Sequence, residues 1–182
     1  MIERGKIMND VLKVLQERRS CRNFQTKMIP KKMLDVILEA GTYAPSGMGK
    51  QSPIIIAITN LEVRNKIARE NGKIAGLKDG IDPFYGAPVI LAVLADTTIS
   101  TYLYDGSLVI GNMLNAAESL GLGSIWIHRA KEEFASEFGK NLLKELGITG
   151  AYEGIGFCAL GYRDSKKPKA AKRKENYIYY LQ

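Results

Sequence analysis

The sequence predicts one domain of three layers, in which helices cover both faces of a single sheet. Apolar residues at helical spacing alternate along the chain with short, continuous apolar runs, a pattern typical of layered helices and strands. The length of 182 residues suits one domain, and no repeat, linker or low-complexity tract divides it. We therefore expect a single domain over residues 1–182. The spacing alone leaves the direction of the strands open.

The first predicted helix spans Asn9–Arg19. Ile7, Val11 and Leu15 recur at helical spacing, and the asparagine and aspartate at its start can accept hydrogen bonds from the free amides. Pro30 opens the second helix, where its missing N–H costs nothing. The buried face of this second helix is expected to consist of Met33, Leu34, Ile37 and Leu38, with Gly41 near its end.

Four strands are predicted from short apolar runs rich in β-branched residues. They are Ile54–Thr59, Pro88–Ala95, Ser124–His128 and Ile155–Leu160. The first of them is a continuous β-branched run, and we expect it to be covered on both faces.

Three further helices lie between the strands, over Leu61–Glu70, Tyr104–Leu120 and Glu132–Leu146, the last as one or two helices. The middle one is apolar around most of its circumference, which places it in the core, and Gly121 ends it. Ala44–Gln51 and Asn71–Gly86 are predicted loops. The composition of the second loop leaves open whether it closes over a site as a lid.

The net charge of +7 is concentrated near the C-terminus. Seven basic residues and one acid lie between Arg163 and Lys174. A nucleic-acid-binding tail is one interpretation, although no aromatic residues are interleaved to support it. The sequence Tyr177–Leu181 alternates like a strand outside the layered core. Such a strand needs a pairing partner, and a second subunit is one way to supply it.

Composition also excludes several classes of protein. The longest uncharged apolar runs are far shorter than the ~20 residues that cross a bilayer. The N-terminus lacks the apolar core of a signal peptide, so we expect a cytoplasmic protein. Two scattered cysteines and one histidine suit neither a disulfide framework nor a four-ligand zinc site, and we expect no metal.

The common catalytic signatures are missing from the sequence. It has no phosphate-binding P-loop and no serine-hydrolase elbow, and its Gly121-Leu122-Gly123 opens a strand rather than a helix. Because no acid, base or nucleophile cluster is evident, the sequence suits chemistry that a cofactor supplies.

Arg18, Ser20 and Arg22 form the sharpest local feature. They alternate, so in an extended backbone they point the same way. Two guanidinium groups and a hydroxyl could hold an anion such as a phosphate. A solvated basic turn, or arginines turned to the carbonyl end of their own helix, are the alternatives.

Two other segments carry candidate ligand contacts. The glycine-containing Pro45–Gln51 could lay backbone amides against a flat ligand, although such a segment also serves as an ordinary connection. His128 stands beside Trp126 at the end of a predicted strand and suits either a proton donor or a packing residue.

Five motifs, in order, resemble the FMN-dependent nitroreductase family along nearly the whole chain. They are Arg18-Arg19-Ser20-x-Arg22, Ala44-Pro45-Ser46 followed by Gln51, Gly86-Ala87-Pro88, the helix end from Ala117 to Ser124, and Leu160-Gly161-Tyr162 followed by Lys172-Arg173-Lys174. Each motif is weak alone, but five in the right order are specific. The resemblance implies an α+β fold, a nitroreductase-like three-layer α/β/α sandwich whose sheet is mainly antiparallel. It further implies a homodimer with FMN at the subunit interface and a C-terminal strand that extends to the partner.

The resemblance also assigns roles to particular residues. Those implied to hold the phosphate and ribityl chain are Arg18, Ser20 and Arg173, with Arg22 at the pyrimidine edge. Those implied to line the isoalloxazine from the partner subunit are Pro45, Ser46 and Gly47. The backbone implied to reach the flavin near N5 is that of Ile127, His128 and Arg129. The further implied contacts are Arg19, Met48, Gln51, Trp126 and Lys172, while Lys166, Lys167 and Lys169 are expected to stay in solvent.

The implied activity is a transfer of two electrons from NADH or NADPH, through FMN, to a nitroaromatic, a quinone or a similar small-molecule acceptor. This chain departs from the family pattern at Gly49, at Ser52-Pro53 and at His128-Arg129. Because an imidazole and a guanidinium would border the pocket, we expect a preference for electron-rich or anionic acceptors. The alternatives are a flavoprotein of the same fold with another task (dehalogenation, flavin cleavage or sensing) and a small basic nucleic-acid-binding protein.

Overall fold

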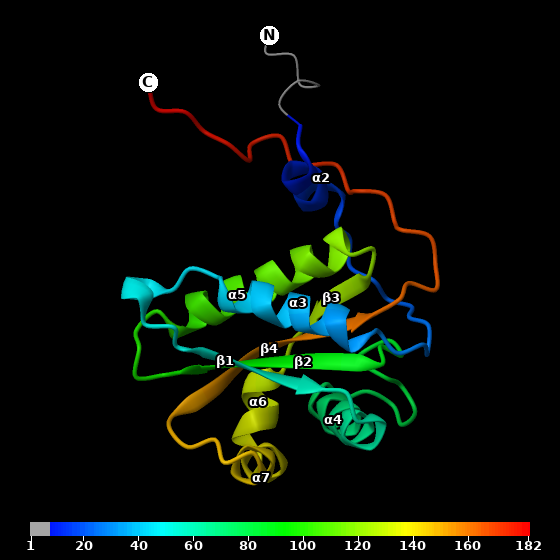
Figure 1. Cartoon of the computed structure of the whole chain (residues 1–182), viewed down its shortest axis with the longest axis vertical. Helices are drawn as coiled ribbons and strands as arrows, with labels where there is room; N and C mark the ends of the chain where they lie inside the picture. The colour runs from blue at the N-terminus through cyan, green and yellow to red at the C-terminus, as the bar shows by residue number, and fades with distance from the viewer. Residues whose placement is uncertain (1–7) are drawn as a thin grey trace.

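The computed structural model describes residues 8–182 and shows one four-stranded sheet between two helical layers (Figure 1). The strand order is β1-β2-β4-β3, with β1 at Pro53–Ile58, β2 at Val89–Asp96, β3 at Gly123–Ile127 and β4 at Tyr152–Gly161. Every neighbouring pair is antiparallel. The α+β class that the resemblance implied is therefore confirmed.

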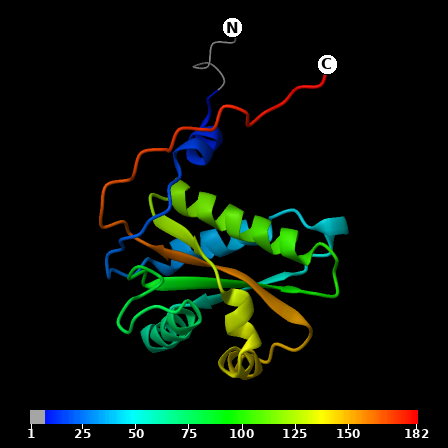
Figure 2. The ribbon, with the colours of Figure 1, turned by 180° about the vertical axis from the view of Figure 1, so that it is seen from behind.

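Helices cover both faces of the sheet (Figures 1 and 2). α3 (Lys31–Thr42) and α5 (Tyr102–Ser119) lie on one face, and α4 (Leu61–Ile74), α6 (Ala130–Ala135) and α7 (Glu137–Glu145) lie on the other. The short α2 (Asp10–Glu17) stands outside these layers. Successive residues of a strand point to opposite faces, so Ile90 and Leu94 of β2 pack toward α4 and α6, whereas Leu91 packs toward α3 and α5.

Two of the predicted helix ends are fixed by capping interactions that the structure shows. The side chain of Asn9 accepts a hydrogen bond from the Leu12 amide at 2.9 Å. Gly121 ends α5 at φ 74°, where the Leu122 amide donates to the Ala117 carbonyl at 2.9 Å. Ile7 lies outside the described residues. The predicted helices and strands of the layered core are all present among the described residues. Their ends are shifted by up to three residues, except that α4 extends four residues further than predicted.

The expectation that residues 54–59 are covered on both faces is confirmed only in part: Ile54 and Ile56 pack against the core on one face and Ile55 on the other, but all three stay half-buried. β1 pairs only with β2 and forms an edge of the sheet. Its first four residues, a proline and three isoleucines, are half-buried, and Ala57 is exposed. A β-branched run is equally compatible with a central strand and with an edge strand that is uncovered in a single chain.

The predicted boundary between helix and loop at residue 70 is also wrong. α4 continues to Ile74, because Asn71 and Gly72 are buried on its inner side. The following segment is anchored to the core: Phe84 is fully buried, and Asp82 forms an ion pair with Arg64 of α4. These contacts fix the second half of the predicted loop, so the structure gives no support for a lid there.

Residues 177–181 do not form the predicted strand. Their side chains are all exposed, and the chain around them has only a turn, in which the Tyr177 amide donates to the Glu175 carbonyl at 2.9 Å. A strand at the end of a chain needs a ladder partner, and no other described segment lies beside it to provide one.

No helix within residues 8–182 has both the length and the apolar character needed to cross a membrane. Over the same range, no three His, Cys, Asp or Glu side chains gather in a way that could hold a metal ion. Cys21 and Cys158 are free and buried, and burial raises the pKa of Cys158 to about 12.

Candidate functional site

A cleft of about 770 Å³ lies between two segments from opposite ends of the chain. One wall is the end of α2 with the segment that follows it, and the other is the C-terminal segment, which runs past α2 in both views (Figures 1 and 2). Its polar and charged lining residues are Gln16, Arg18, Arg19, Ser20, Arg22, Lys169 and Arg173. The lining holds five cationic side chains and no acid, so the cleft suits an anionic ligand.

The backbone holds Arg18, Ser20 and Arg22 in the extended form that the alternation predicted. Ser20 makes a parallel bridge to Ser124 of β3, and the Cys21 amide donates to the Ser124 carbonyl at 3.0 Å. All three side chains line the cleft, and the guanidinium groups of Arg18 and Arg22 have no hydrogen-bond or ion-pair partner within residues 8–182.

Arg19 behaves differently from its neighbours. Its Nη1 donates to the carbonyls of Gln16 at 2.7 Å and of Arg18 at 2.6 Å, so it turns to the carbonyl end of its own helix. Its Nε is buried and has no partner among the residues that the structure describes. Arg19 therefore follows the alternative interpretation, in which an arginine bonds to the carbonyl end of its own helix. Its Nε stays without a partner among the described residues.

The basic C-terminal segment divides between internal ion pairs and the cleft. Arg163 Nη2 lies 2.9 Å from Glu118 Oε2, and Lys167 pairs with the other oxygen of Glu118. Lys166, Lys167 and Lys169 are all exposed, as expected, although Lys167 also pairs with Glu118 and Lys169 lines the cleft with Arg173. Lys172 lies outside the cleft lining and faces Glu175 at 3.8 Å.

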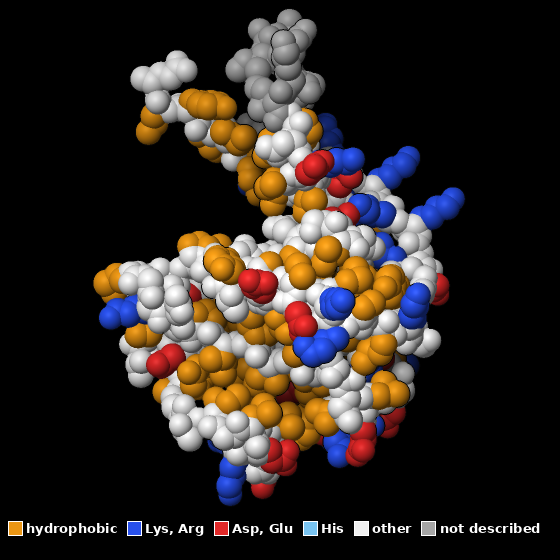
Figure 3. Space-filling model, viewed as in Figure 1, with side chains coloured by type: hydrophobic (Ala, Val, Ile, Leu, Met, Phe, Trp, Pro, Cys, Tyr) orange, Lys and Arg blue, Asp and Glu red, His pale blue; other side chains and the backbone are white. Residues whose placement is uncertain are grey.

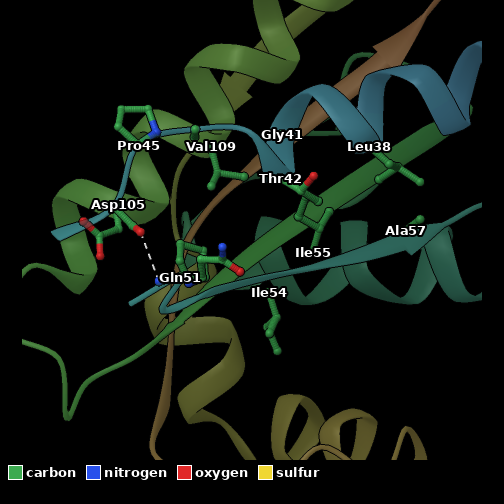
Figure 4. A pocket seen from close by; sticks show the side chains of 13 residues that line it. Leu38, Gly41, Thr42, Pro45, Gln51, Ile54, Ile55, Ala57, Asp105 and Val109 are labelled. Carbon is green, nitrogen blue, oxygen red and sulfur yellow. Dashed lines mark hydrogen bonds between the residues drawn. The ribbon is translucent and has the colours of Figure 1, made fainter. Parts of the chain in front are cut away.

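Residues 44–51 border a second cavity, of about 470 Å³, between α3, α5 and β1 (Figure 4). Pro45, Ser46 and Gln51 line it, and Ser46 Oγ accepts from the Gln51 amide at 3.0 Å. Met48 and Gln51 have positive φ values of 52° and 49°. This backbone is locally strained, so something must hold it.

Asp105 of α5 holds this loop. Its carboxylate is 3% exposed and accepts from the Gly47 amide at 3.0 Å, the Ser52 hydroxyl at 2.9 Å and the Thr101 hydroxyl at 3.0 Å. A Cβ on Gly47 would lie 2.3 Å from Thr101 Oγ1, so only glycine fits there. Sequence reasoning missed Asp105. Its one local signal is an acid in the first turn of a mostly apolar helix.

The end of β3 gathers the other predicted contacts. Trp126 packs over Gly156, where a Cβ would approach the indole to 2.8 Å, and its ring centroid lies 5.8 Å from that of His128. Ile127 is buried and His128 is exposed. Arg129 is left-handed, at φ 78° and ψ 11°, which costs a non-glycine residue about 1–2 kcal/mol.

A buried network lies behind this turn. Asn71 of α4 contacts both His128 and Arg129, and it also contacts Glu133 of α6. Burial raises the pKa of Glu133 to about 8, mainly by disfavouring the charged form. Sequence reasoning missed Asn71 and Glu133, since neither belongs to a local pattern.

The two cavities lie at opposite ends of α5. Asp105 marks the loop at its amino end and Glu118 marks the cleft at its carboxyl end, about 20 Å apart along the helix axis. Within one chain, the structure brings Arg18, Ser20 and Arg22 together with Arg173, and it keeps residues 45–51 apart from them.

Comparisons with known proteins agree on one family. The sequence model described as "Nitroreductase family" matches residues 15–75. A nitroreductase structure with bound FMN from Bacteroides fragilis is 29% identical, covers 96% of this chain and all of its own, and has a TM-score of 0.88. A second one with bound FMN, from Desulfitobacterium hafniense, is 31% identical, covers 97% of this chain and all of its own, and has a TM-score of 0.86.

Among curated proteins, one from Methanothermobacter thermautotrophicus carries the provisional name NADH dehydrogenase/NAD(P)H nitroreductase. It is 33% identical over 127 aligned positions, and the alignment covers 67% of this chain and 63% of that protein. The match therefore spans less than two thirds of the length of this relative.

Proposed function

Since this chain belongs to the nitroreductase family, we propose that it is a single-domain, FMN-dependent oxidoreductase. It would take electrons from NADH or NADPH and pass them to a nitroaromatic, a quinone or a similar acceptor. The observation that carries the proposal is the cationic cleft, in which Arg18 and Arg22 meet Arg173 from the other end of the chain. The FMN-bound structures of the two relatives support this choice of ligand.

The residues of the cleft fit the phosphate end of FMN. Guanidinium groups donate two parallel hydrogen bonds to phosphate oxygens, and the open groups of Arg18 and Arg22 can do so without breaking an internal bond. The buried, unpartnered Nε of Arg19 is one more donor. We propose that Arg18, Ser20 and Arg173 bind the phosphate and ribityl chain, with Arg22 at the pyrimidine edge.

When bound, FMN supplies hydride acceptance and donation at its N5 atom. The chain itself binds and orients: the backbone of residues 127–129 would contact the flavin, and residues 45–47 would line the ring. Because the cofactor supplies the chemistry, no side chain needs to act as a nucleophile. The exposed imidazole of His128 and the nearby guanidinium of Arg129 support a preference for anionic acceptors.

We propose a homodimer, because one chain leaves the loop and the cleft at opposite ends of α5. Several surfaces support this. β1 has a free edge, and apolar side chains gather along it (Figure 3). On α2, Val11 is 68% exposed, and residues 177–181 form an exposed apolar tail. If residues 177–181 of one protomer pack on the β1 edge of the other, both the tail and the strand edge would be covered. We also place the protein in the cytoplasm, where NAD(P)H is available.

The visible absorption spectrum tests the proposal directly. The purified protein is mixed with FMN, dialysed extensively, and scanned. Retained flavin bands, followed by oxidation of NADH or NADPH on addition of a nitroaromatic, are the expected result. A colourless protein would contradict the proposal. Retained FMN without nitroreduction would instead indicate another task on the same fold.

A further inference from the structure

The turn after β3 has a backbone conformation that needs support. Arg129 is left-handed although it is not glycine, and its side chain forms no capping hydrogen bond with α6. Strained conformations of this kind persist only where the surrounding structure fixes them. The support therefore has to come from outside the turn.

One side chain bonds to both residues of the turn. Asn71 is fully buried on α4, more than fifty residues earlier in the chain. Its Nδ2 donates to the His128 carbonyl at 3.1 Å, and its Oδ1 accepts from Arg129 Nε at 3.0 Å. These two bonds hold the carbonyl before the left-handed residue and the side chain of that residue.

Glu133 fixes the orientation of Asn71. The second Nδ2 hydrogen of Asn71 is donated to Glu133 Oε2 at 3.0 Å, and the Glu133 side chain is 1% exposed. Rotating the amide by half a turn would point Asn71 Oδ1 at the carbonyl oxygen of His128 and turn Nδ2 toward the Nε donor of Arg129. Only one orientation of the amide is therefore compatible with its neighbours.

Charge favours this arrangement as well. The buried carboxyl of Glu133 has a pKa raised to about 8, so it is neutral at pH 7 and does not leave an unpaired charge in the core. Burial outweighs the hydrogen bond from Asn71 and the charge of Arg129, which both lower the pKa, and the charge of Glu70 raises it further. Arg129 uses only its Nε toward Asn71, so its terminal amino groups have no partner within the described chain.

We propose that Asn71 and Glu133 are positioning residues that hold the turn at His128 and Arg129 in the conformation with which its backbone reaches the flavin. The inference rests on the proposed function, because it treats this turn as a cofactor contact. It assigns the support of the cofactor site to two buried side chains on α4 and α6 that themselves lie behind the turn.

Trp126 is the single tryptophan of the chain and lies two residues before His128, so it reports on this turn without interference. In FMN-free protein, Asn71→Ala is expected to at least double the acrylamide quenching constant of Trp126. The same variant should raise the dissociation constant for FMN about tenfold. Asn60→Ala is the matched control, because it removes an asparagine from the other end of α4, where its side chain caps the helix by accepting from the Val63 amide. That control should leave both readouts at wild-type values.

Two further variants separate positioning from mere packing. Glu133→Gln keeps an acceptor for Asn71 and should stay close to wild type. Glycine is left-handed without strain, so Arg129→Gly should remove the need for Asn71. Adding Asn71→Ala to Arg129→Gly should then change neither readout by more than about twofold, a coupling between two sites that a double-mutant cycle measures. If Asn71→Ala alone does not fold, the comparison of Arg129→Gly with the double variant Arg129→Gly/Asn71→Ala tests the proposal instead.

The failures of the two proposals are distinguishable. If the wild type does not retain FMN, the proposed function fails, and Trp126 quenching still decides whether Asn71 holds the turn. If the wild type binds FMN but Asn71→Ala matches Asn60→Ala in either readout, the inference is overturned and the proposed function stands. An equal effect of Asn71→Ala with and without Arg129→Gly would also overturn it.

Discussion

At the carboxyl end of α5, the guanidinium groups of Arg18 and Arg22 have no partner within residues 8–182 and line an open cleft. At the amino end of the same helix, Asp105 is buried and accepts three hydrogen bonds from the chain around it. One end keeps its donors free, and the other uses its acceptor to fix the backbone. Removing a free donor should therefore change binding and leave stability intact, whereas removing a buried support should change stability first.

The buried side of this contrast is sharpest at Glu133. Its pKa is about 8 in the folded chain and near its ordinary 4.5 in the unfolded chain, so between these values only the folded state holds the proton. The free energy of unfolding should fall as pH rises through this window, by about 1.4 kcal/mol per pH unit at most, and level off above pH 8.

Urea unfolding at a series of pH values from 5 to 9 measures this slope. Glu133→Gln, which has no proton to lose, should flatten it by a total on the order of 4 kcal/mol. Parallel curves for the variant and the wild type would show that Glu133 is ionised in the folded chain.

Asp105→Ala should cost the next largest amount. It removes three hydrogen bonds to a buried carboxylate and leaves the Gly47 amide without its acceptor, so we expect a loss of about 3 kcal/mol in thermal or urea unfolding. Asp35→Ala is the control, since Asp35 is half-exposed and pairs only with Lys31, which should cost under about 0.5 kcal/mol. If both variants lost the same free energy of unfolding, Asp105 would contribute no more to stability than a surface carboxylate.

Arg18→Ala tests the open side. A charged hydrogen bond is worth about 1.5–3 kcal/mol, so the dissociation constant for FMN should rise about 10- to 100-fold. The free energy of unfolding should stay within about 0.5 kcal/mol of the wild type, because the guanidinium bonds to nothing within residues 8–182. Equilibrium dialysis measures the first quantity, and Lys166→Ala controls for the loss of one positive charge. A variant that keeps its flavin through dialysis would refute the assignment of Arg18.

The smallest expected effect concerns the acceptor. Turnover of nitrobenzoate should exceed that of a cationic nitroaromatic, and Arg129→Gln should narrow this ratio about threefold, since a partly exposed charge is worth under about 1 kcal/mol. Steady-state rates on both compounds give the ratio. Faster turnover of the cation by the wild type would contradict the preference.

What the sequence predicted well depends on residues close together in the chain. Arg18, Ser20 and Arg22 alternate over five positions, so a single extended segment was enough to predict their common direction. Gly121 and Asn9 were predicted as helix ends for the same reason, because a cap acts within one turn of its helix.

What could not be predicted depends on contacts between distant segments. Asp105 meets Gly47 across 58 positions, and Asn71 meets Glu133 across 62, so no local pattern reveals either pair. The boundary of α4 failed for this reason, since burial of Asn71 carries the helix past Glu70. The incomplete cover of β1 was missed for a different reason, because side-chain type alone does not separate a central strand from an edge.

The double ion pair of Glu118 also changes how the C-terminal segment can act. By holding Arg163 and Lys167, this one carboxylate ties down the chain six residues before Arg173. A short tether keeps a binding group at a high effective concentration near its target, whereas a long free tail spreads it through a much larger volume. We therefore expect Glu118 to increase the fraction of time that Arg173 spends at the cleft, although Glu118 lies outside the cleft lining.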